Sequence, residues 1–294
     1  MKDTKTATKN YDKKESRAAE IWRRLRKNVG AMFGLCVILI FATLAICANL
    51  IVPEETIALQ NAAIRLQGPS AEHIFGTDGY GRDIFARVLY GARISLTIGL
   101  FTAFFSLIIG GTLGAAAAFY GGKVDNLIMR IMDMFTAIPG TLLALAIVAA
   151  IGASMTNLLI AITISSIPGF VRLIRSSVLT VVESDYVEAA RACATKDGRI
   201  ILKHILPNAI GPIIVQTTSS ISGMILQASG LSFIGMGVQP PTPEWGSMIS
   251  ESREFMRVAP HMMIFPGACI ILAALSFNLI GDGLRDAFDP RLRD

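Results

Sequence analysis

Charged residues are scarce in this sequence and unevenly distributed. Only 17% of the 294 residues are Asp, Glu, Lys or Arg, against roughly 25% in a typical soluble domain. Because about 20 apolar residues cross the hydrocarbon core of a bilayer, the long uncharged stretches exclude an ordinary soluble protein and predict a multi-pass membrane protein. Those stretches are 28–53, 94–122, 134–171, 204–243 and 258–281.

The sequence also lacks the motifs of an ATPase or a metalloenzyme. A phosphate-binding loop requires Gly-x-x-x-x-Gly-Lys-Ser/Thr, and the nearest approach, Gly122-Lys123, is followed by Val124 instead of a hydroxyl residue. The three histidines have no metal-binding spacing, and the four cysteines give no disulfide framework. We therefore expect no catalytic residue, no metal site and no cofactor bound by this chain.

Ionisable groups inside the membrane, which proton or ion coupling normally requires, are almost absent from the apolar stretches. The exceptions, Asp125, Arg130 and Asp133, stand at the predicted inner end of the third span. We assign them to helix pairing or the membrane interface, with gating as the alternative. Scarce intramembrane charge argues against a proton-coupled carrier.

The apolar stretches predict an all-α integral membrane protein with six spanning helices. The stretch 134–171 is long enough for two helices with a break at Gly152-Ala153-Ser154, and 204–243 for one helix followed by a Gly/Pro-rich loop. Five segments follow: a cytoplasmic N-terminal segment (1–28), a first span (29–52), an external segment leading into span two (53–93), a core of five helices (94–281) that contains the cytoplasmic loop 172–207, and a cytoplasmic tail (282–294).

Lysine and arginine indicate the orientation of these helices, because cytoplasmic loops carry an excess of both residues. Ten lie in 1–28, two in 123–130, six in 172–207 and three in 282–294, which makes 21 on one side. The alternate loops, 53–93 and 236–260, hold four and two. The distribution places both termini and the 172–207 loop in the cytoplasm.

Small residues and prolines predict how the spanning helices pack and where they bend. Span two contains Gly110-Gly111, Gly114 and four consecutive alanines, which let helix backbones approach closely in lipid and predict a place inside the bundle. Pro139-Gly140, Pro168-Gly169 and Gly211-Pro212 predict kinks or breaks in spans three to five.

The loop 172–207 is a helix-forming block that crossing a bilayer does not require. Ser184 is suited to cap a helix over 185–195, with Asp185 in its first turn. Lys196-Asp197-Gly198 predicts a turn, and Arg199 to Leu206 predicts a second short helix that ends where Pro207 starts the next span. A helix–turn–helix unit tied to span five would pass a force applied by another protein into the bundle.

This loop resembles the permease subunits of ABC-type importers. In that family the loop carries Glu-Ala-Ala, a Gly four positions after the last Ala, and an ending in Ile-x-Leu-Pro. It forms the coupling helix that docks on an ATPase subunit. Glu188-Ala189-Ala190 matches, and Ile205-Leu206-Pro207 ends the loop with the Leu-Pro pair intact, whereas Ala194 stands at the glycine position. Since glycine frees the backbone at a bend, we expect the bend at the next glycine, Gly198.

Three further blocks resemble the dipeptide/oligopeptide/nickel branch of these importers, and the cytoplasmic N-terminus resembles its C-type subunit. They are Gly76-Thr77-Asp78 with Gly81-Arg82-Asp83 and the following 90–96, the segment 231–246, and the ending 277–291. From the first two we select an external gate or a contact with a binding protein, although a passive loop is the alternative. The residues selected are Asp78, Arg82, Asp83, Gln239, Pro241 and Trp245.

The resemblance implies a type I importer permease that translocates di- or oligopeptides across the cytoplasmic membrane of a bacterium. It also implies a second, homologous permease, two cytoplasmic ATPases that bind ATP and Mg²⁺, and an external substrate-binding protein. Nickel or glutathione stays open as the substrate. The other classes of function are a channel or carrier that works without an ATPase and a structural membrane subunit.

Overall fold

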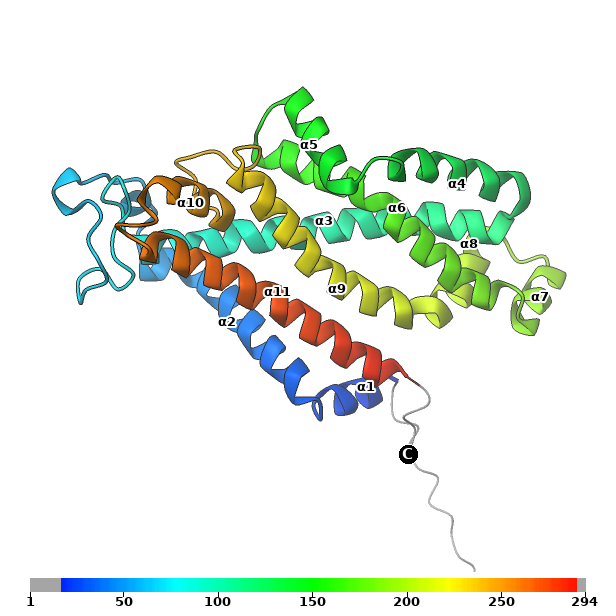
Figure 1. Cartoon of the computed structure of the whole chain (residues 1–294). Helices are drawn as coiled ribbons and strands as arrows, with labels where there is room; N and C mark the ends of the chain where they lie inside the picture. The colour runs from blue at the N-terminus through cyan, green and yellow to red at the C-terminus, as the bar shows by residue number, and fades with distance from the viewer. Residues whose placement is uncertain (1–16, 290–294) are drawn as a thin grey trace, which may run out of the picture.

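Long helices lie side by side along most of the chain in the computed structural model, which describes residues 17–289 (Figure 1). Residues 1–16 of the predicted N-terminal segment and 290–294 of the predicted tail lie outside that range. Between residues 17 and 289 no β-strand forms, and Thr77 and Asp83 make only an isolated bridge. The α-helices are α1 (Arg17–Leu25), α2 (Val29–Ile51), α3 (Ile84–Tyr120), α4 (Gly122–Thr136), α5 (Gly140–Ile151), α6 (Met155–Val182), α7 (Asp185–Ala192), α8 (Asp197–Ile200), α9 (Leu206–Phe233), α10 (Trp245–Glu251) and α11 (His261–Phe288).

The predicted all-α fold is confirmed, with one difference in the third span. Within the described residues, five helices are long and apolar enough to cross a membrane, and a sixth span arises only if α4 and α5 are taken together. These two helices meet at 79°. The bend falls at Pro139 because proline has no N–H to donate and disfavours a helical residue before it. Pro168 and Pro212, by contrast, lie within the continuous helices α6 and α9.

Glycines set the central helix contact, between α3 and α6. A Cβ atom at Gly110 would lie 2.5 Å from Cβ of Phe170, and one at Gly114 would lie 2.6 Å from the carbonyl oxygen of Val171. Only glycine therefore allows this approach, since the four-residue spacing puts both positions on one helix face. The small residues of span two do pack inside the bundle, and their partner is α6.

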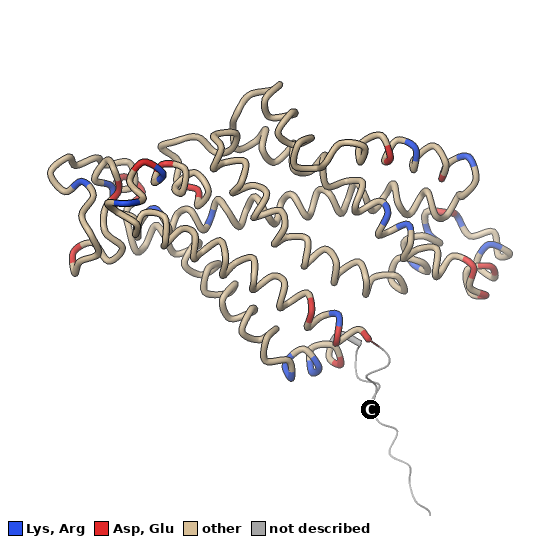
Figure 2. Tube along the Cα trace, viewed as in Figure 1, with Lys and Arg blue, Asp and Glu red and all other residues tan. Residues whose placement is uncertain are grey.

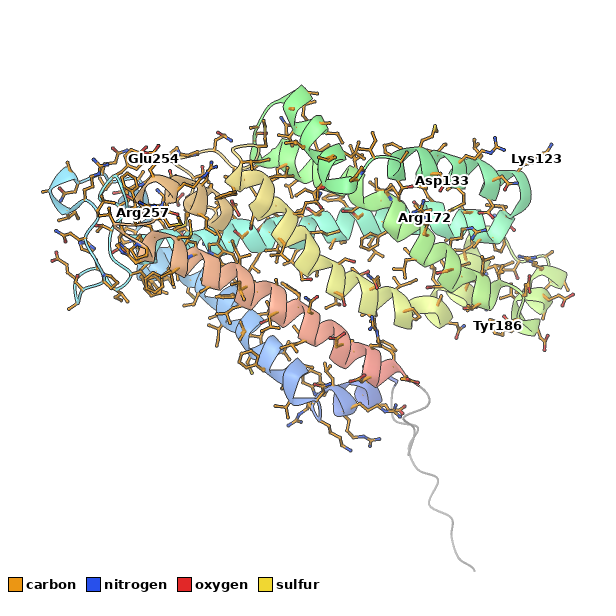
Figure 3. The ribbon with its side chains drawn as sticks, viewed as in Figure 1. Lys123, Asp133, Arg172, Tyr186, Glu254 and Arg257 are labelled. Atoms are coloured by element: carbon orange, nitrogen blue, oxygen red, sulfur yellow. The ribbon has the colours of Figure 1, made fainter. Side chains whose placement is uncertain are left out.

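Charged residues gather at the two ends of the bundle, with a further group on α1 and the last turns of α11, and the stretches between are almost uncharged (Figure 2). One end holds the segment 52–83 and α10, where Glu254 and Arg257 lie (Figure 3). The other end holds α7 and the start of α4, where Tyr186 and Lys123 lie (Figure 3). We call these the outer end and the α7 end. The long uncharged middle is what a membrane requires.

Candidate functional site

The α7 unit, residues 184–205, closes the α7 end of the bundle. Ser184 occupies the N-cap position of α7, as predicted, but its hydroxyl makes no capping bond and donates instead to the Val181 carbonyl at 2.6 Å. Asp185 and Glu188 lie in the first turn and Arg191 in the last. This order of charges complements the helix dipole.

The bend after α7 lies at Ala194, so the prediction that it moves to Gly198 is wrong. Ala194 has φ +51°, in the left-handed region that glycine usually fills, whereas Gly198 lies inside α8. The amide of Ala194 donates to the Arg191 carbonyl (2.9 Å), and the amide of Thr195 donates to the Ala190 carbonyl (3.1 Å). These two bonds form a Schellman cap, which satisfies the last carbonyls of α7 and holds alanine in the strained conformation.

The second part of the unit is continuous with the next span. Instead of a separate helix over 199–206, α8 runs through a π-helical turn, Ile201–Ile205, directly into α9. Pro207 lacks an amide hydrogen and would leave a carbonyl of the preceding turn without its ordinary i−4 partner. The wider π turn, with the Leu206 amide bonded to the Ile201 carbonyl, absorbs this mismatch without breaking the helix.

Three fully buried side chains fix the α7 unit to the bundle. Val187, Ile200 and Ile205 have no exposed surface and share one apolar cluster with residues of α3 and α6. An eight-residue helix is marginal in water by itself. Burial of each such side chain contributes about 1.5–3 kcal/mol, so tertiary packing is what holds α7 in place.

Two polar contacts tie the unit to the end of α3. The Arg191 guanidinium carbon lies 4.8 Å from the ring centroid of Phe119, a cation–π distance. The neighbouring Tyr120 side chain lies close enough to Asp197 for the two to interact electrostatically. A displacement of α7 therefore acts on both α3 and α9.

The predicted coupling residues divide between the surface and the core of this unit. Glu188 and Ala189 are exposed, together with Asp185 and Tyr186, while Ala190 packs against the apolar cluster. Ala194, Gly198 and Pro207 are exposed along the following turn and helix, and Ile205 and Leu206 face the cluster. The structure thus exposes the start of the Glu-Ala-Ala motif and half-buries Ala190, its last residue. Sequence reasoning did not select Val187, Ile200 or Arg191, although the apolar spacing of the first two was a usable signal.

At the outer end, four charged side chains form a nearly closed cluster. The Arg82 guanidinium contacts Asp78 at 2.6 Å and Glu251 at 2.9 Å, and Arg87 contacts Glu251 at 2.7 Å and Asp78 at 3.4 Å. Both arginine side chains are at most 3% exposed. Removing one member of such a cluster leaves a buried charge unpaired, which costs about 3–5 kcal/mol. Asp78 and Arg82 are thus internal braces of the outer loops, and sequence reasoning missed Arg87 and Glu251.

The remaining predicted outer residues lie in two different settings. Trp245 is fully buried and its indole N–H donates to the Val88 carbonyl (3.1 Å), while Asp83 caps α3 at the Ala86 amide (2.9 Å). Gln239 and Pro241 are exposed at the tip of the 234–243 loop. Within this set, those two have the exposure that a direct contact with another protein requires.

Glu244, which precedes Trp245, is buried and caps the N-terminus of α10. Its two carboxylate oxygens accept from the amides of Gly246 (2.9 Å) and Ser247 (2.8 Å), and the Ser95 hydroxyl donates at 3.2 Å. Burial nevertheless raises the pKa of Glu244, because its desolvation outweighs these hydrogen bonds. The carboxyl group joins α10 to α3.

Two of the three charged residues predicted near span three, Asp125 and Asp133, pair helices, as the structural interpretation required. Asp125 of α4 accepts two bonds from Arg175 of α6, at 2.6 and 2.5 Å. Asp133 accepts from Arg172 at 2.8 Å, and these two side chains point toward one another (Figure 3). Among the described residues no group of three or more His, Cys, Asp or Glu side chains is placed to hold a metal ion.

Comparison with protein families gives two matches. The model of the "binding-protein-dependent transport system inner membrane component" matches residues 107–294, and that of the "N-terminal TM domain of oligopeptide transport permease C" matches residues 16–69.

Similar full-length proteins carry transport names. A dipeptide transport system permease protein of Alkalihalophilus pseudofirmus is 51% identical over 93% of this chain and 90% of its own length. Glutathione transport system permease proteins of Pectobacterium atrosepticum and Escherichia coli are each 45% identical over 93% of this chain and 91% and 90% of their own lengths.

Among solved structures, the MetNI methionine ABC transporter in inward-facing conformations has a similar fold. Its chain matches with a TM-score of 0.57 and 17% identity, over 70% of this chain and 98% of that chain.

Proposed function

The chain belongs to the family of binding-protein-dependent transport system inner membrane components, and from this premise we propose the following function. It is a multi-pass permease subunit of an ABC importer, in which ATP hydrolysis occurs on separate subunits. The solutes that we propose for it are di- or oligopeptides. The observation that carries the coupling mechanism is the packed α7 unit, which exposes Glu188 and Ala189 at one end of the bundle.

The family implies ATPase subunits, a second permease and a substrate-binding protein as partners. We propose one copy each of two different permeases, two ATPases that bind ATP and Mg²⁺, and one external binding protein. Each of the two related permeases would dock on one ATPase through its own α7 unit. The two permeases would then enclose a single path for the solute between them.

Coupling runs through the α7 unit in this proposal. The exposed face around Glu188 docks on an ATPase, and closure of the ATPase pair displaces α7. The buried side chains Val187, Ile200 and Ile205 carry that displacement into α3, α6 and α9, and the bundle alternates between access to the two sides of the membrane. The exposed Gln239 and Pro241 are the proposed contacts of the outer end with the binding protein.

The α7 end faces the cytoplasm in this proposal. The excess of lysine and arginine in 1–28, 123–130, 172–207 and 282–294 supports that orientation. The gathering of α7 and the start of α4 at one end of the structure also supports it (Figure 1). Both termini are then cytoplasmic.

The similar proteins support a peptide as the transported solute. One is named for dipeptide transport at 51% identity and others for glutathione transport at 45%. Glutathione, itself a peptide, is therefore the second candidate. The solute that co-purifies with the partner binding protein distinguishes the two: a mixture of dipeptides supports the first and glutathione alone supports the second.

The assembled importer, reconstituted in proteoliposomes, tests the class of function. We expect uptake of a labelled dipeptide only when the ATPase subunits, the binding protein and ATP are all present. Uptake driven by an ion gradient without the ATPase subunits would overturn the proposal.

A charge reversal tests the docking role. Glu188→Lys should abolish co-purification of the ATPase subunits, because it reverses an exposed charge on the docking face. Glu254→Lys makes the same change at an exposed position at the outer end (Figure 3) and should leave co-purification intact. Equal recovery of the ATPase with both variants would remove α7 from the docking role.

A further inference from the structure

A polar groove runs along α6 and α9 in the uncharged middle of the molecule. It encloses about 460 Å³, and its polar or small lining residues are Ser165, Ser166, Gly169, Gln216, Ser220, Gly223 and Gln227. None of the residues lining the described groove is charged. Amide and hydroxyl groups at this depth are costly against lipid, so this face of the bundle requires water or a polar ligand.

The groove continues toward the part of the bundle where α1 and the last turns of α11 lie (Figure 1). A second cavity of about 830 Å³ is bounded there by α1, the first half of α9 and the end of α11, and charged residues, among them Glu20, Arg24 and Arg285, line it. The two cavities share Leu173 and Gln216 in their walls. Together they form one path from that part of the molecule to its middle.

The side chains of the groove are free to bind a ligand. The amide of Gln216 and the hydroxyl of Ser166 donate to no described residue, and the Ser220 hydroxyl donates to the carbonyl of Gln216 (2.7 Å), which leaves its oxygen as an acceptor. At the end of the groove beside the bend between α4 and α5, the Gln227 side-chain amide donates to the Ser165 hydroxyl (3.4 Å) and to the Gly140 carbonyl (3.5 Å). These are long, weak bonds that a ligand can replace.

The spacing of these groups matches an extended peptide. Gln216, Ser220, Gly223 and Gln227 follow one another by four, three and four residues, so they share one face of α9. At 1.5 Å per residue this face is about 16 Å long, the length of roughly five residues of extended chain at 3.3 Å each. A neutral row of donors and acceptors of this length suits backbone amides.

We propose that this groove is the surface along which this chain carries a peptide, and that it binds the peptide backbone without selecting side-chain charge. The inference rests on the proposed peptide importer and adds the residues of the path and the part of the peptide that they recognise. Selection among peptides then occurs outside this groove.

Thiol accessibility tests the exposure of the groove in the assembled importer. With the four native cysteines replaced, Ser220→Cys should react with a membrane-impermeant, charged thiol reagent, and added peptide with ATP should slow the reaction. Leu226→Cys lies on another face of α9, where Leu226 is 50% exposed, and should stay unreactive because that face meets lipid. An unreactive Ser220→Cys would overturn the inference and show that the second permease covers this face.

A charge placed in the groove tests recognition. Ser220→Asp should lower the ratio of acidic to basic tripeptide uptake by roughly tenfold, because a fixed carboxylate repels a like charge across this narrow, poorly screened space. The neutral Ser220→Asn should leave that ratio unchanged, whatever its effect on the rate. An unchanged ratio in Ser220→Asp would overturn the inference.

Wild-type uptake is measured first, so that a failure of the proposed function can be distinguished from a failure of the groove assignment. If the wild-type complex imports neither tripeptide, the proposed function fails. If it imports both while Ser220→Cys is unreactive or Ser220→Asp shows no charge preference, only the groove assignment fails.

Discussion

The left-handed backbone of Ala194 predicts opposite effects for the same substitution at two nearby positions. A left-handed conformation costs an L-residue roughly 1–2 kcal/mol, and Ala194 adopts it with φ +51°. Glycine removes that cost but loses about 0.5–1 kcal/mol more conformational entropy on folding. The Ala194 side chain is exposed, so no packing is lost, and Ala194→Gly should stabilise the end of α7 by roughly 0.5–1 kcal/mol.

Ala189→Gly is the matched control. Ala189 is also exposed but lies inside α7 with helical backbone, where glycine costs about 0.8–1.0 kcal/mol relative to alanine. The two variants make the same chemical change, one inside α7 and one in the turn that ends it. The sign of the effect therefore depends only on the backbone conformation at each position.

Hydrogen exchange of the backbone amides in the α7 unit measures both effects locally. Since 1.4 kcal/mol is a factor of ten, Ala194→Gly should slow exchange at the amides of Ala194 and Thr195 by roughly two- to fivefold. Ala189→Gly should speed exchange across α7 by about four- to fivefold. Exchange that is unchanged or faster in Ala194→Gly would refute the strain argument, and so would a shift of the same sign in both variants.

Two further predictions concern helix contacts and pH. Gly114→Ala should lower the thermal unfolding midpoint of the purified protein, because the new Cβ would lie 2.6 Å from a backbone oxygen of α6 and overpacking costs about 1–3 kcal/mol. Gly111→Ala is the control and should leave the midpoint unchanged, because its Cβ would make an ordinary 3.4 Å contact. Equal midpoints for the two variants would contradict this account. Burial raises the pKa of Glu244, so its stabilising contribution is fully present below the ordinary carboxyl pKa of about 4.3 and is lost as pH rises through the folded-state pKa. The unfolding midpoint should fall with rising pH less steeply in Glu244→Gln than in the wild type, and parallel curves would count against this role.

The spanning helices could be predicted from the sequence because membrane helices leave a one-dimensional signal. Every backbone group must be satisfied within the segment, so a long uncharged stretch has few alternatives to helix. Helix α2 occupies the stretch predicted for the first span, and the break before α6 lies at Gly152, as predicted. The third span differed because Pro139 divides it into two helices, and the sequence alone did not set the 79° bend.

The candidate site was predictable only in its local part. The position of α7 followed from Ser184 and the alanine-rich sequence after it. The conformation of Ala194 did not, because an alanine enters the left-handed region only when surrounding packing holds it there. The outer cluster was hidden for another reason: Arg87 and Glu251 are 164 residues apart, and no local pattern pairs them.

One continuous helix joins the two proposed sites. The helix from Asp197 to Phe233 does not break, so the second part of the α7 unit, from Asp197 on, and the polar groove lie on the same element. Its first residues pack with Val187 behind the exposed Glu188, and its later residues, Gln216 to Gln227, line the groove. A displacement of α7 therefore passes to this helix through the packing of Val187 and the turn at 193–196, and no break then separates that helix from the wall of the path. The π turn at Ile201–Ile205 is the place where this helix departs from regular geometry, and so where its tilt against α7 would change most easily.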